Sequence, residues 1–455
     1  MAVGAKPVSG WHRRSFLVRS FGVGAALAGW NVNEELEASL QNVNRNSGPS
    51  QLKITDLRVA SLGRAPFSST IVRIDTNQGI SGYGEVRDGA SKRYALMLKS
   101  RILGENPCSV DKIFRRIKQF GHHARQAGGV CAVEMACWDL AGKAWGVPAW
   151  QMLGGKFRDK IRLYCDTPQT PDAAEAGRRL KARMDMGYSF LKVDFGVGLL
   201  DKIPGALNRP LGLSLRDVNE VMHPFTGIEI TDLGLDYLRE YVGGIREVIG
   251  MEVPLASDHF GHIGVNSCIR LGKAVEKYQL AWLEDMIPWQ FTELLKEIKL
   301  AIDVPLCTGE DIYLKEGFRR LVEAKAVDVV HPDLATSGGL LETKKIGDIA
   351  MENGVAMAMH YAGTPIGFLA SVHCAAATEN FLCLEHHGVD IEYWEDLVLG
   401  IEKPIVRNGF VMVPDAPGLG VEPNEEVIRR HLAEPGYFEP TPEWDQIDSW
   451  DRLWS

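Results

Sequence analysis

From Ile161 to about residue 400, short apolar runs alternate with longer amphipathic stretches, and several of the runs end on an acidic residue. The runs ValProLeuAla, LeuAlaTrpLeu and ValProLeuCys lead into Asp258, Glu284 and Glu310. These acids are evenly spaced, since 284 − 258 = 26 and 310 − 284 = 26. Because about 26 residues accommodate one strand, one helix and the loops between them, the spacing predicts consecutive βα units of a barrel.

The residues before the barrel follow a different pattern. Residues 52–86 alternate apolar and polar positions around an AsnGlnGly turn, which predicts two or three antiparallel strands. Residues 88–155 have a helical pattern, and the GlyGly pair at 128–129 is expected to end a helix. We therefore expect three structural parts: an α+β domain at 52–160, a barrel at 161–400 and a C-terminal segment at 401–455 that returns to the first domain.

One interval in the barrel is much longer than the others. Asp194 ends the second expected strand and lies 64 residues before Asp258 (258 − 194 = 64). The surplus, residues 196–250, is rich in glycine and proline and leaves the barrel on the face where the acids are expected. Long loops inside compact domains are usually functional or disordered. We interpret 196–250 as a lid over a substrate, with an inert insertion as the alternative.

The three evenly spaced acids would lie at the carboxyl ends of neighbouring strands, where barrel enzymes have their active sites. Oxygen ligands of this kind suit Mg²⁺, which prefers carboxylates and water to nitrogen or sulfur. Single acids are common in βα loops and at helix N-caps, but three in phase favour a metal site. We predict that Asp258, Glu284 and Glu310 bind one Mg²⁺ in each active site.

The same phase continues to an aspartate and a histidine. Asp333 lies 23 residues beyond Glu310 (333 − 310 = 23) and His360 lies 27 beyond Asp333 (360 − 333 = 27), each after an apolar run. At the ends of adjacent strands, the carboxylate would orient the imidazole and raise its basicity. Glu385 ends the next apolar run. A structural histidine is the alternative, but its place after an aspartate and across from three acids favours a catalytic base.

These positions form an ordered set: Lys192 and Asp194 as Lys-x-Asp, then Asp258, Glu284, Glu310, Asp333, His360 and Glu385. The set resembles the mandelate racemase/muconate lactonizing enzyme branch of the enolase superfamily, and within it the galactonate- and mannonate-type sugar-acid dehydratases. The resemblance spans about residues 52–432 and includes the segments 70–85, 134–155 and 415–422. It implies a modified TIM barrel, (β/α)7β, with an N-terminal α+β capping domain. It also implies a Mg²⁺-dependent lyase that converts a sugar acid to a 2-keto-3-deoxy acid.

The resemblance implies roles for individual residues. His360, oriented by Asp333, would abstract the proton alpha to the substrate carboxylate, with Glu385 as a further catalytic residue. Racemase-like members carry Lys-x-Lys where this chain has Lys192 and Asp194, so racemisation by two bases is disfavoured. Lys192 would clamp the substrate carboxylate; an ion pair with Asp194 or a neighbour is the alternative.

The acid that protonates the leaving hydroxyl departs from the resemblance. Galactonate dehydratase-like proteins have a histidine two residues after the first metal ligand, and Phe260 occupies that position here. We expect His262 to act instead; the alternatives are His360 acting as both base and acid, and a residue on the 196–250 insertion. The expected substrate contacts are Asp194, His259, His122, His123 and Arg125.

Two other functions are compatible with the same residues. An epimerase or cycloisomerase acting on a sugar acid would form the same enediolate without releasing a keto acid. A non-catalytic periplasmic protein that binds sugar acids would need no base. The complete set of metal-binding and dyad residues counts against this last function.

Composition restricts the partners of the protein. The 455-residue chain has a net charge of −9 and a pI of about 5.8, and no basic stripe interrupted by aromatics, which argues against nucleic acid. A small-molecule carboxylate is the expected substrate and a homo-oligomer the expected assembly. The eight cysteines lack paired CxxC spacing, so we predict buried thiols, with Cys165, Cys307 and Cys383 in apolar runs.

The N-terminus carries a separate feature. Residues 11–20, TrpHisArgArgSerPheLeuValArgSer, precede a short, weakly apolar run and resemble a twin-arginine export signal. The run is too short to span a bilayer, so no membrane anchor is expected. We predict that 1–51 is a signal and linker, and that the protein is periplasmic or secreted, or cytoplasmic if the signal is not used. A basic tail is the alternative.

Overall fold

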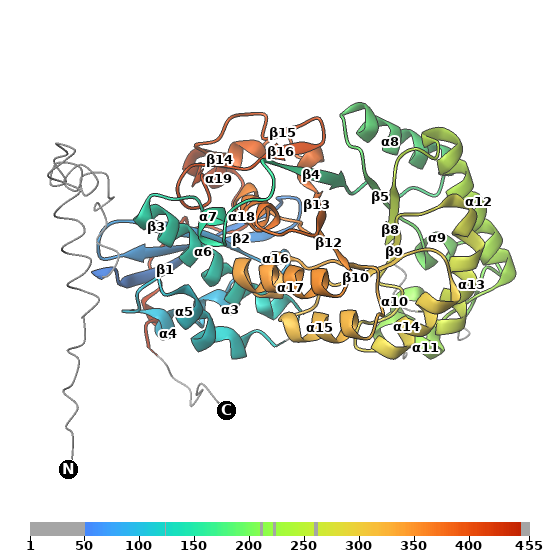
Figure 1. The fold of residues 1–455 in the computed structure, drawn as a ribbon, viewed down its shortest axis with the longest axis horizontal. Helices are drawn as coiled ribbons and strands as arrows, with labels where there is room; N and C mark the ends of the chain where they lie inside the picture. Colours follow the sequence, from blue (N-terminus) through green and yellow to red (C-terminus); the bar gives the residue numbers. More distant parts are fainter. Residues whose placement is uncertain (1–50, 123, 210–212, 222–223, 259–262, 447–455) are drawn as a thin grey trace, which may run out of the picture. The chain divides into compact units, whose positions relative to one another are not determined.

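The computed structural model describes residues 51–122, 124–209, 213–221, 224–258 and 263–446 (Figure 1). The twin-arginine segment lies outside these residues, as do His123, His259, Phe260 and His262. Within the described part of the chain, no helix combines the length and apolar character that a membrane span requires. The export signal and the roles of these histidines therefore stay predictions.

The described chain begins with a three-stranded antiparallel sheet in the order β1–β2–β3, which confirms the strands expected there. Its strands are β1 (Ile54–Leu62), β2 (Ser69–Thr76) and β3 (Ser81–Val86). Helix α6 (Ala127–Trp145) packs directly on β3. A Cβ at Gly84 would lie only 2.0 Å from the carbonyl oxygen of Ala132, so glycine is required for this contact.

The glycine pair at 128–129 lies inside α6, so the expectation that it ends a helix is wrong. A Cβ at Gly128 would lie 2.6 Å from the backbone nitrogen of Arg87, the residue directly after β3. The pair therefore allows the start of α6 to contact the backbone around Arg87. The shorter helices of this cap domain are α3 (Arg93–Leu96), α4 (Lys99–Ile102), α5 (Val110–Ile117) and α7 (Ala149–Met152).

Eight parallel strands form a closed barrel, because β13 pairs with both β12 and β4. In barrel order the strands are β4 (Lys160–Cys165), β5 (Leu191–Asp194), β8 (Leu255–Asp258), β9 (Trp282–Glu284), β10 (Leu306–Thr308), β11 (Val329–Val330), β12 (Ala356–Met359) and β13 (Phe381–His386). The helices between them are α8 (Ala173–Asp185), α12 (Asp232–Ile249), α13 (Val265–Val275), α14 (Thr292–Ala301), α15 (Lys315–Glu323), α16 (Leu334–Ser337), α17 (Leu340–Glu352) and α18 (Pro365–Ala376). This arrangement confirms the modified TIM barrel with an α+β cap.

One side chain from or beside each barrel strand fills the barrel interior: Tyr164, Phe190, Ala256, Trp282, Cys307, Val329, Ala358 and Cys383. The rings of Tyr164 and Trp282 meet edge to face, with centroids 5.7 Å apart. The interior is therefore a packed core below the strand ends. All eight cysteines are free thiols and seven are buried, as predicted.

The segment expected as a lid, 196–250, has two structural parts. Its last third is α12, which packs along α8 as an ordinary barrel helix, so the surplus ends near Thr231. In the surplus, Phe225 meets the ring of Phe291, which precedes α14, with centroids 4.8 Å apart. The surplus contains α9 (Val197–Leu200), β6 (Leu207–Asn208), α10 (Leu215–Val221), α11 (Pro224–Gly227) and β7 (Glu229–Ile230).

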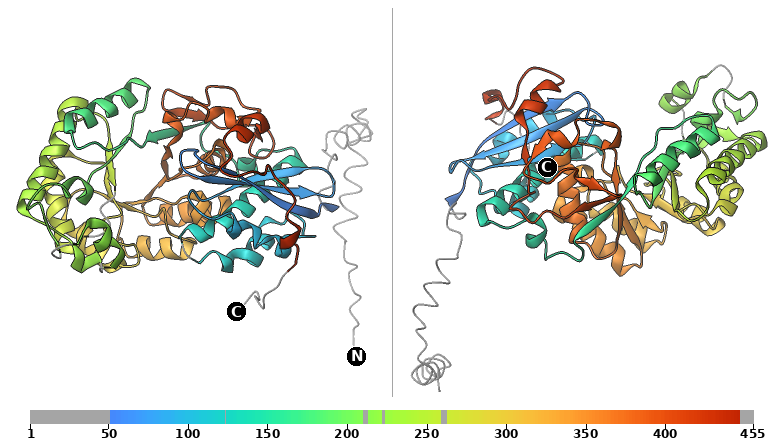
Figure 2. Two further views of the ribbon diagram at one scale, coloured as in Figure 1. Left: turned by 180° about the vertical axis from the view of Figure 1, so that it is seen from behind. Right: turned by 90° about the horizontal axis from the view of Figure 1, so that it is seen from above.

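The C-terminal segment contacts both the barrel and the cap. Strand β16 (Phe410–Met412) pairs with β15 (Val406–Arg407) and with the beginning of β4, while β14 (Val398–Leu399) pairs with β17 (Glu422–Pro423) before α19 (Glu425–Arg430). Farther along, the backbone nitrogen of Ala433 donates to the carbonyl oxygen of Ser61 in β1, and that of Phe438 donates to that of Val59. This part of the chain, drawn in red, therefore lies beside the blue cap strands (Figure 2).

Candidate active site

Acidic and histidine side chains gather at the carboxyl ends of the barrel strands, which share one face of the barrel. Asp258, Glu284 and Asp285 form one cluster: a carboxylate oxygen of each lies within 4.8 Å of the others. Asp258 ends β8 and Glu284 ends β9. Asp285 takes a left-handed conformation with φ of 49°, so the chain turns sharply where β9 ends.

The ammonium group of Lys192 lies among these carboxylates. Its Nζ is 2.9 Å from Asp258 Oδ2, 3.3 Å from Glu284 Oε1 and 3.1 Å from Glu385 Oε1. Burial opposes the charge on Lys192, but the three carboxylates raise its pKa well above the ordinary value. Lys192 therefore carries a fixed positive charge. Its ion pairs with neighbouring acids match the alternative that we stated to a clamp on the substrate carboxylate.

His360 and Asp333 are joined by a short hydrogen bond. His360 Nδ1 is 2.6 Å from Asp333 Oδ2, and the other carboxylate oxygen accepts from the Ala335 backbone nitrogen at 2.6 Å. Nε2 of His360 faces Glu310 Oε2 at 3.3 Å and Glu385 Oε2 at 3.7 Å. Since Nδ1–H is donated to Asp333, Nε2 is the nitrogen that can accept a proton.

Opposing charges set the protonation of this dyad. Burial lowers the pKa of His360, but Glu310, Glu385 and Asp333 raise it to about 9. Burial would raise the pKa of Glu310, yet the charges of His360 and Arg87 hold it well below its usual range. Arg87 and His360 likewise keep the pKa of buried Asp333 low. The two acids are therefore ionised, and the charge of Glu310 is the largest factor that keeps a proton on His360.

Arg87 of the cap is a part of the site that we did not predict from the sequence. Its Nη1 donates to Asp333 Oδ2 and lies 2.8 Å from His360 Nδ1, while its Nη2 donates to Glu310 Oε1 at 3.2 Å. The side chain is only 1% exposed. The cap therefore supplies a buried cation that holds two acids of the barrel beside the base.

A second cap arginine extends this network toward solvent. Arg87 Nη1 is 3.0 Å from Asp88 Oδ1, and Arg125 Nη1 donates to Asp88 Oδ2 at 2.8 Å. Arg125 is 42% exposed, so it is accessible to solvent. Its contact with substrate stays a prediction, as does that of the exposed His122.

Replacing Arg87 with Met should destabilise the protein by about 3–5 kcal/mol, because it leaves Asp333 and Glu310 as buried carboxylates without their cation. Thermal or urea unfolding measures this loss. Arg116→Met is the matched control, since Arg116 pairs with Glu105 at the surface and is 45% exposed, and the expected change is below about 1 kcal/mol. Equal destabilisation by the two variants would contradict this role of Arg87.

Buried aromatic and histidine side chains support the acids from below. Trp282 Nε1 donates to Glu284 Oε2 at 2.9 Å, and His331 Nδ1 lies 2.9 Å from Glu284 Oε1. The Tyr164 hydroxyl donates to Glu385 Oε2 at 2.8 Å and lies 2.5 Å from His331 Nε2. Because Trp282 precedes Glu284 by two residues, strand alternation already places the two side chains on one face. These contacts fix Glu284 and Glu385 in orientation.

Two adjacent histidines after Glu385 lie in different surroundings. His386 packs against the Trp394 ring, with centroids 4.9 Å apart, and burial lowers its pKa to about 3. His387 faces the acids instead: Nε2 is 3.2 Å from Glu385 Oε1 and Nδ1 is 3.8 Å from Asp166 Oδ2. Burial opposes a charge on His387, but Glu385 raises its pKa. His387 is therefore a further polar group of the site that we did not predict.

Asp194, another residue expected in the site, is held in place by the barrel strand that carries it. Asp194 ends β5 and lies opposite Asp258 in the register of β5 and β8. Its carbonyl oxygen accepts from Gln169 Nε2 at 3.0 Å. Asp194 is thus beside the acid cluster, and its role in substrate binding stays a prediction.

The donor set of this face fits a divalent cation. Lys192 shows that a positive charge is stabilised between Asp258 and Glu284, and carboxylate oxygens are the ligands that Mg²⁺ prefers. Glu310 lies beside His360. Burial raises the pKa of Asp285, and the negative charges of Asp258 and Glu310 raise it further. Asp258 and Glu284 could therefore hold the ion beside Asp285, while Glu310 lies outside that cluster, next to His360, and its part as the third ligand stays a prediction.

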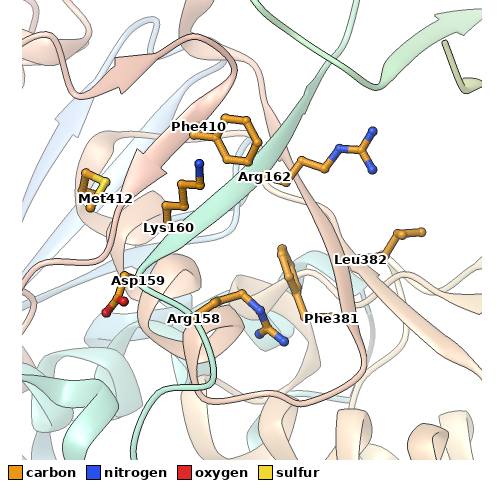
Figure 3. A pocket seen from close by; sticks show the side chains of 8 residues that line it. All are labelled: Arg158, Asp159, Lys160, Arg162, Phe381, Leu382, Phe410 and Met412. Carbon is orange, nitrogen blue, oxygen red and sulfur yellow. The ribbon is translucent and has the colours of Figure 1, made fainter. Parts of the chain in front are cut away.

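A surface cavity of about 440 Å³ lies at the opposite end of the barrel, where β4 and β13 begin (Figure 3). Its basic groups already have partners. Arg158 donates to the carbonyl oxygens of Thr378 and Glu379, and Arg162 donates to Ser189. Lys160 lies over the Phe410 ring at 4.6 Å. This cavity is therefore distinct from the acid cluster.

Two family models match the chain. Residues 171–427 match the enolase C-terminal domain-like model, and residues 37–154 match the mandelate racemase/muconate lactonizing enzyme N-terminal domain. A D-xylonate dehydratase of Haloferax volcanii is 32% identical over 404 residues, which are 86% of this chain and 92% of that protein. A D-galactonate dehydratase family member of Streptomyces bingchenggensis is 27% identical over 400 residues, 84% of this chain and 93% of that protein.

Solved structures give the same result. The crystal structure of a mandelate racemase/muconate lactonizing enzyme-like protein from Rubrobacter xylanophilus has a TM-score of 0.75 at 30% identity, over 85% of this chain and 99% of that chain. The 3,6-anhydro-D-galactonate cycloisomerase of Zobellia galactanivorans, at 23% identity and a TM-score of 0.69 over 84% of this chain and 100% of that chain, shows the fold alone. The chain belongs to the mandelate racemase/muconate lactonizing enzyme family of the enolase superfamily.

Proposed function

We propose that this enzyme is a Mg²⁺-dependent hydro-lyase that dehydrates a sugar acid to a 2-keto-3-deoxy acid. The observation that carries the proposal is the His360–Asp333 dyad, whose Nε2 faces Glu310 beside the acid cluster. The relatives named D-xylonate dehydratase and D-galactonate dehydratase family member support an aldonate as the substrate class.

The reaction begins at the carbon alpha to the substrate carboxylate. His360 Nε2 removes the proton from this carbon, while Asp333 holds the Nδ1–H and stabilises the imidazolium that forms. A Mg²⁺ ion held by Asp258, Glu284 and Glu310 would supply positive charge against the negative charge that develops on the substrate. Loss of the hydroxyl from the next carbon gives an enol, which becomes the keto acid in solution.

The base must be neutral before it can accept this proton. The charge of Glu310 is the largest factor that raises the pKa of His360 to about 9. A cation at Glu310 would neutralise that charge and favour the neutral imidazole. Arg87 acts in the same direction, because its guanidinium lowers the pKa of His360. Lys192 is a weaker candidate for the base, since three carboxylates hold its proton.

An epimerase or cycloisomerase remains the second candidate, because both reactions begin with the same proton abstraction. The fold shared with the 3,6-anhydro-D-galactonate cycloisomerase does not separate the two functions. A non-catalytic binding protein is disfavoured by the buried dyad, since a hydrogen-bonded base adds nothing to the binding of a carboxylate.

A substrate screen tests the proposed function. The purified enzyme with Mg²⁺ is incubated with a panel of aldonic and uronic acids, and keto acid is measured in each reaction. We expect keto acid from one or a few aldonates, and none after EDTA treatment. Conversion of a panel member to an isomer without any keto acid would favour the epimerase or cycloisomerase instead.

A further inference from the structure

Dehydration of a sugar acid needs a proton donor as well as a base. The hydroxyl group is a poor leaving group unless it is protonated as its bond to carbon breaks. His360 carries the proton that it has just removed, so a second acid would separate the two tasks. Among the described residues, His387 is a histidine that lies close to His360 and has ring nitrogens that can carry a proton.

The surroundings of His387 are those of a group that meets a ligand. The ring centroids of His387 and His360 are 5.8 Å apart, and the His387 side chain is 13% exposed. Within the part of the chain that the structure describes, its Nε2 makes no hydrogen bond, although Glu385 Oε1 is 3.2 Å away. The N–H of Nε2 therefore has an acidic neighbour but no well-aligned acceptor, and a ligand oxygen could take that place.

Two further contacts orient the ring. Asp166, at the end of β4, lies on the Nδ1 side with its Oδ2 at 3.8 Å, so carboxylates flank both ring nitrogens. Phe67, in the cap loop before β2, places its ring 6.0 Å from that of His387 and is 50% exposed. The half-exposed Phe67 ring therefore lies beside His387 on the cap side, where a sugar chain could contact it.

We propose that His387 is the acid that protonates the leaving hydroxyl, a role that rests on the proposed dehydration. His360 takes the C2 proton. The electron pair left on the enediolate forms the C2–C3 double bond as the C3–O bond breaks, and the oxygen leaves as water with the proton from His387 Nε2. The enol gains a solvent proton at C3, loses the proton of its C2 hydroxyl to solvent and becomes the keto acid. His360 then releases its proton and His387 regains one from solvent, so the balance is loss of one water.

The test separates proton abstraction from loss of the hydroxyl. His387→Asn and His387→Gln are assayed in deuterium oxide for keto acid and for deuterium at C2 of the recovered substrate. We expect keto acid formation to fall by about 10²–10⁴-fold while C2 exchange continues. A substrate with fluorine in place of the C3 hydroxyl needs no acid, so its elimination should stay within about tenfold of the wild-type rate.

His386→Gln is the matched control, because the adjacent His386 ring faces Trp394 and not the site. We expect it to leave the ratio of C2 exchange to keto acid unchanged, even if it lowers stability. Circular dichroism and melting temperature show which variants are folded, and either His387 variant suffices.

Three results would overturn the proposal. Unchanged keto acid formation in a folded His387 variant would exclude His387 as the acid. Equal losses of exchange, keto acid formation and fluoride elimination would show that His387 only positions the substrate. If the wild-type enzyme exchanges the C2 proton but forms keto acid from no panel member, the proposed function fails and the acid role fails with it. The wild-type assay therefore distinguishes failure of the proposed function from failure of the acid role alone.

Discussion

Replacement of His360 by Asn will remove keto acid formation and alpha-proton exchange together. The dyad places Nε2 toward the acid cluster, and the amide of the Asn variant is not a base that can accept the proton there. We expect a loss of about 10²–10⁴-fold in turnover, the range that a positioned base contributes. The measurement is the keto acid assay on the substrate found in the screen, with C2 exchange in deuterium oxide followed in parallel.

Asp333→Asn is the companion variant for His360. It keeps the imidazole but replaces the carboxylate that accepts from Nδ1, so turnover should fall less than in His360→Asn. Exchange at the wild-type rate in His360→Asn would assign the base to another residue. Lys192 would then be the first to test, because its ammonium lies in the same acid cluster.

The Glu284→Gln variant will lose metal-dependent stabilisation and turnover. Glu284 is fully buried and pairs with Lys192, while Trp282 and His331 hold its orientation, so the amide leaves one fewer charge for the cation. A ligand present at 100 times its Kd stabilises a folded protein by about 2.7 kcal/mol. We expect that shift with Mg²⁺ for the wild-type enzyme and almost none for Glu284→Gln, with turnover reduced by about 10³-fold, the effect of losing several kcal/mol of charge stabilisation.

Glu297→Gln is the matched control, because it removes the same charge from an exposed position on α14. Unfolding of each variant in EDTA gives the baseline, so a general loss of stability is not mistaken for a loss of metal binding. Metal-dependent stabilisation of equal size in Glu284→Gln and the wild type would contradict the assignment of Glu284 as a ligand.

The even spacing of the acids predicted the barrel because each interval corresponds to one βα unit. Asp258 and Glu284 are indeed the last residues of β8 and β9. The same reasoning failed at 196–250, where the interval alone could not show that Thr231 caps α12 and that a normal barrel helix follows. A long interval reveals that residues are added, but not where the regular unit resumes.

The missed residues divide into two kinds. His387 lies two positions after Glu385 but directly beyond the end of β13 and outside its extended backbone, so alternation along the strand did not fix its direction. Arg87 could not have been found from alternation either, because it reaches Asp333 across 246 residues of sequence and from another domain. Local periodicity gives the face of a strand, whereas contacts between the cap and the barrel depend on how the two domains pack.

The central claim is that alpha-proton abstraction leads to loss of water, and one measurement tests it directly. The wild-type enzyme with Mg²⁺ converts the substrate found in the screen in deuterium oxide, and proton NMR follows the signals at C2 and C3. We predict that the C2 proton signal disappears as a 2-keto-3-deoxy acid appears with one deuterium at C3. Disappearance of the C2 signal with recovery of only the substrate or its epimer would contradict the account.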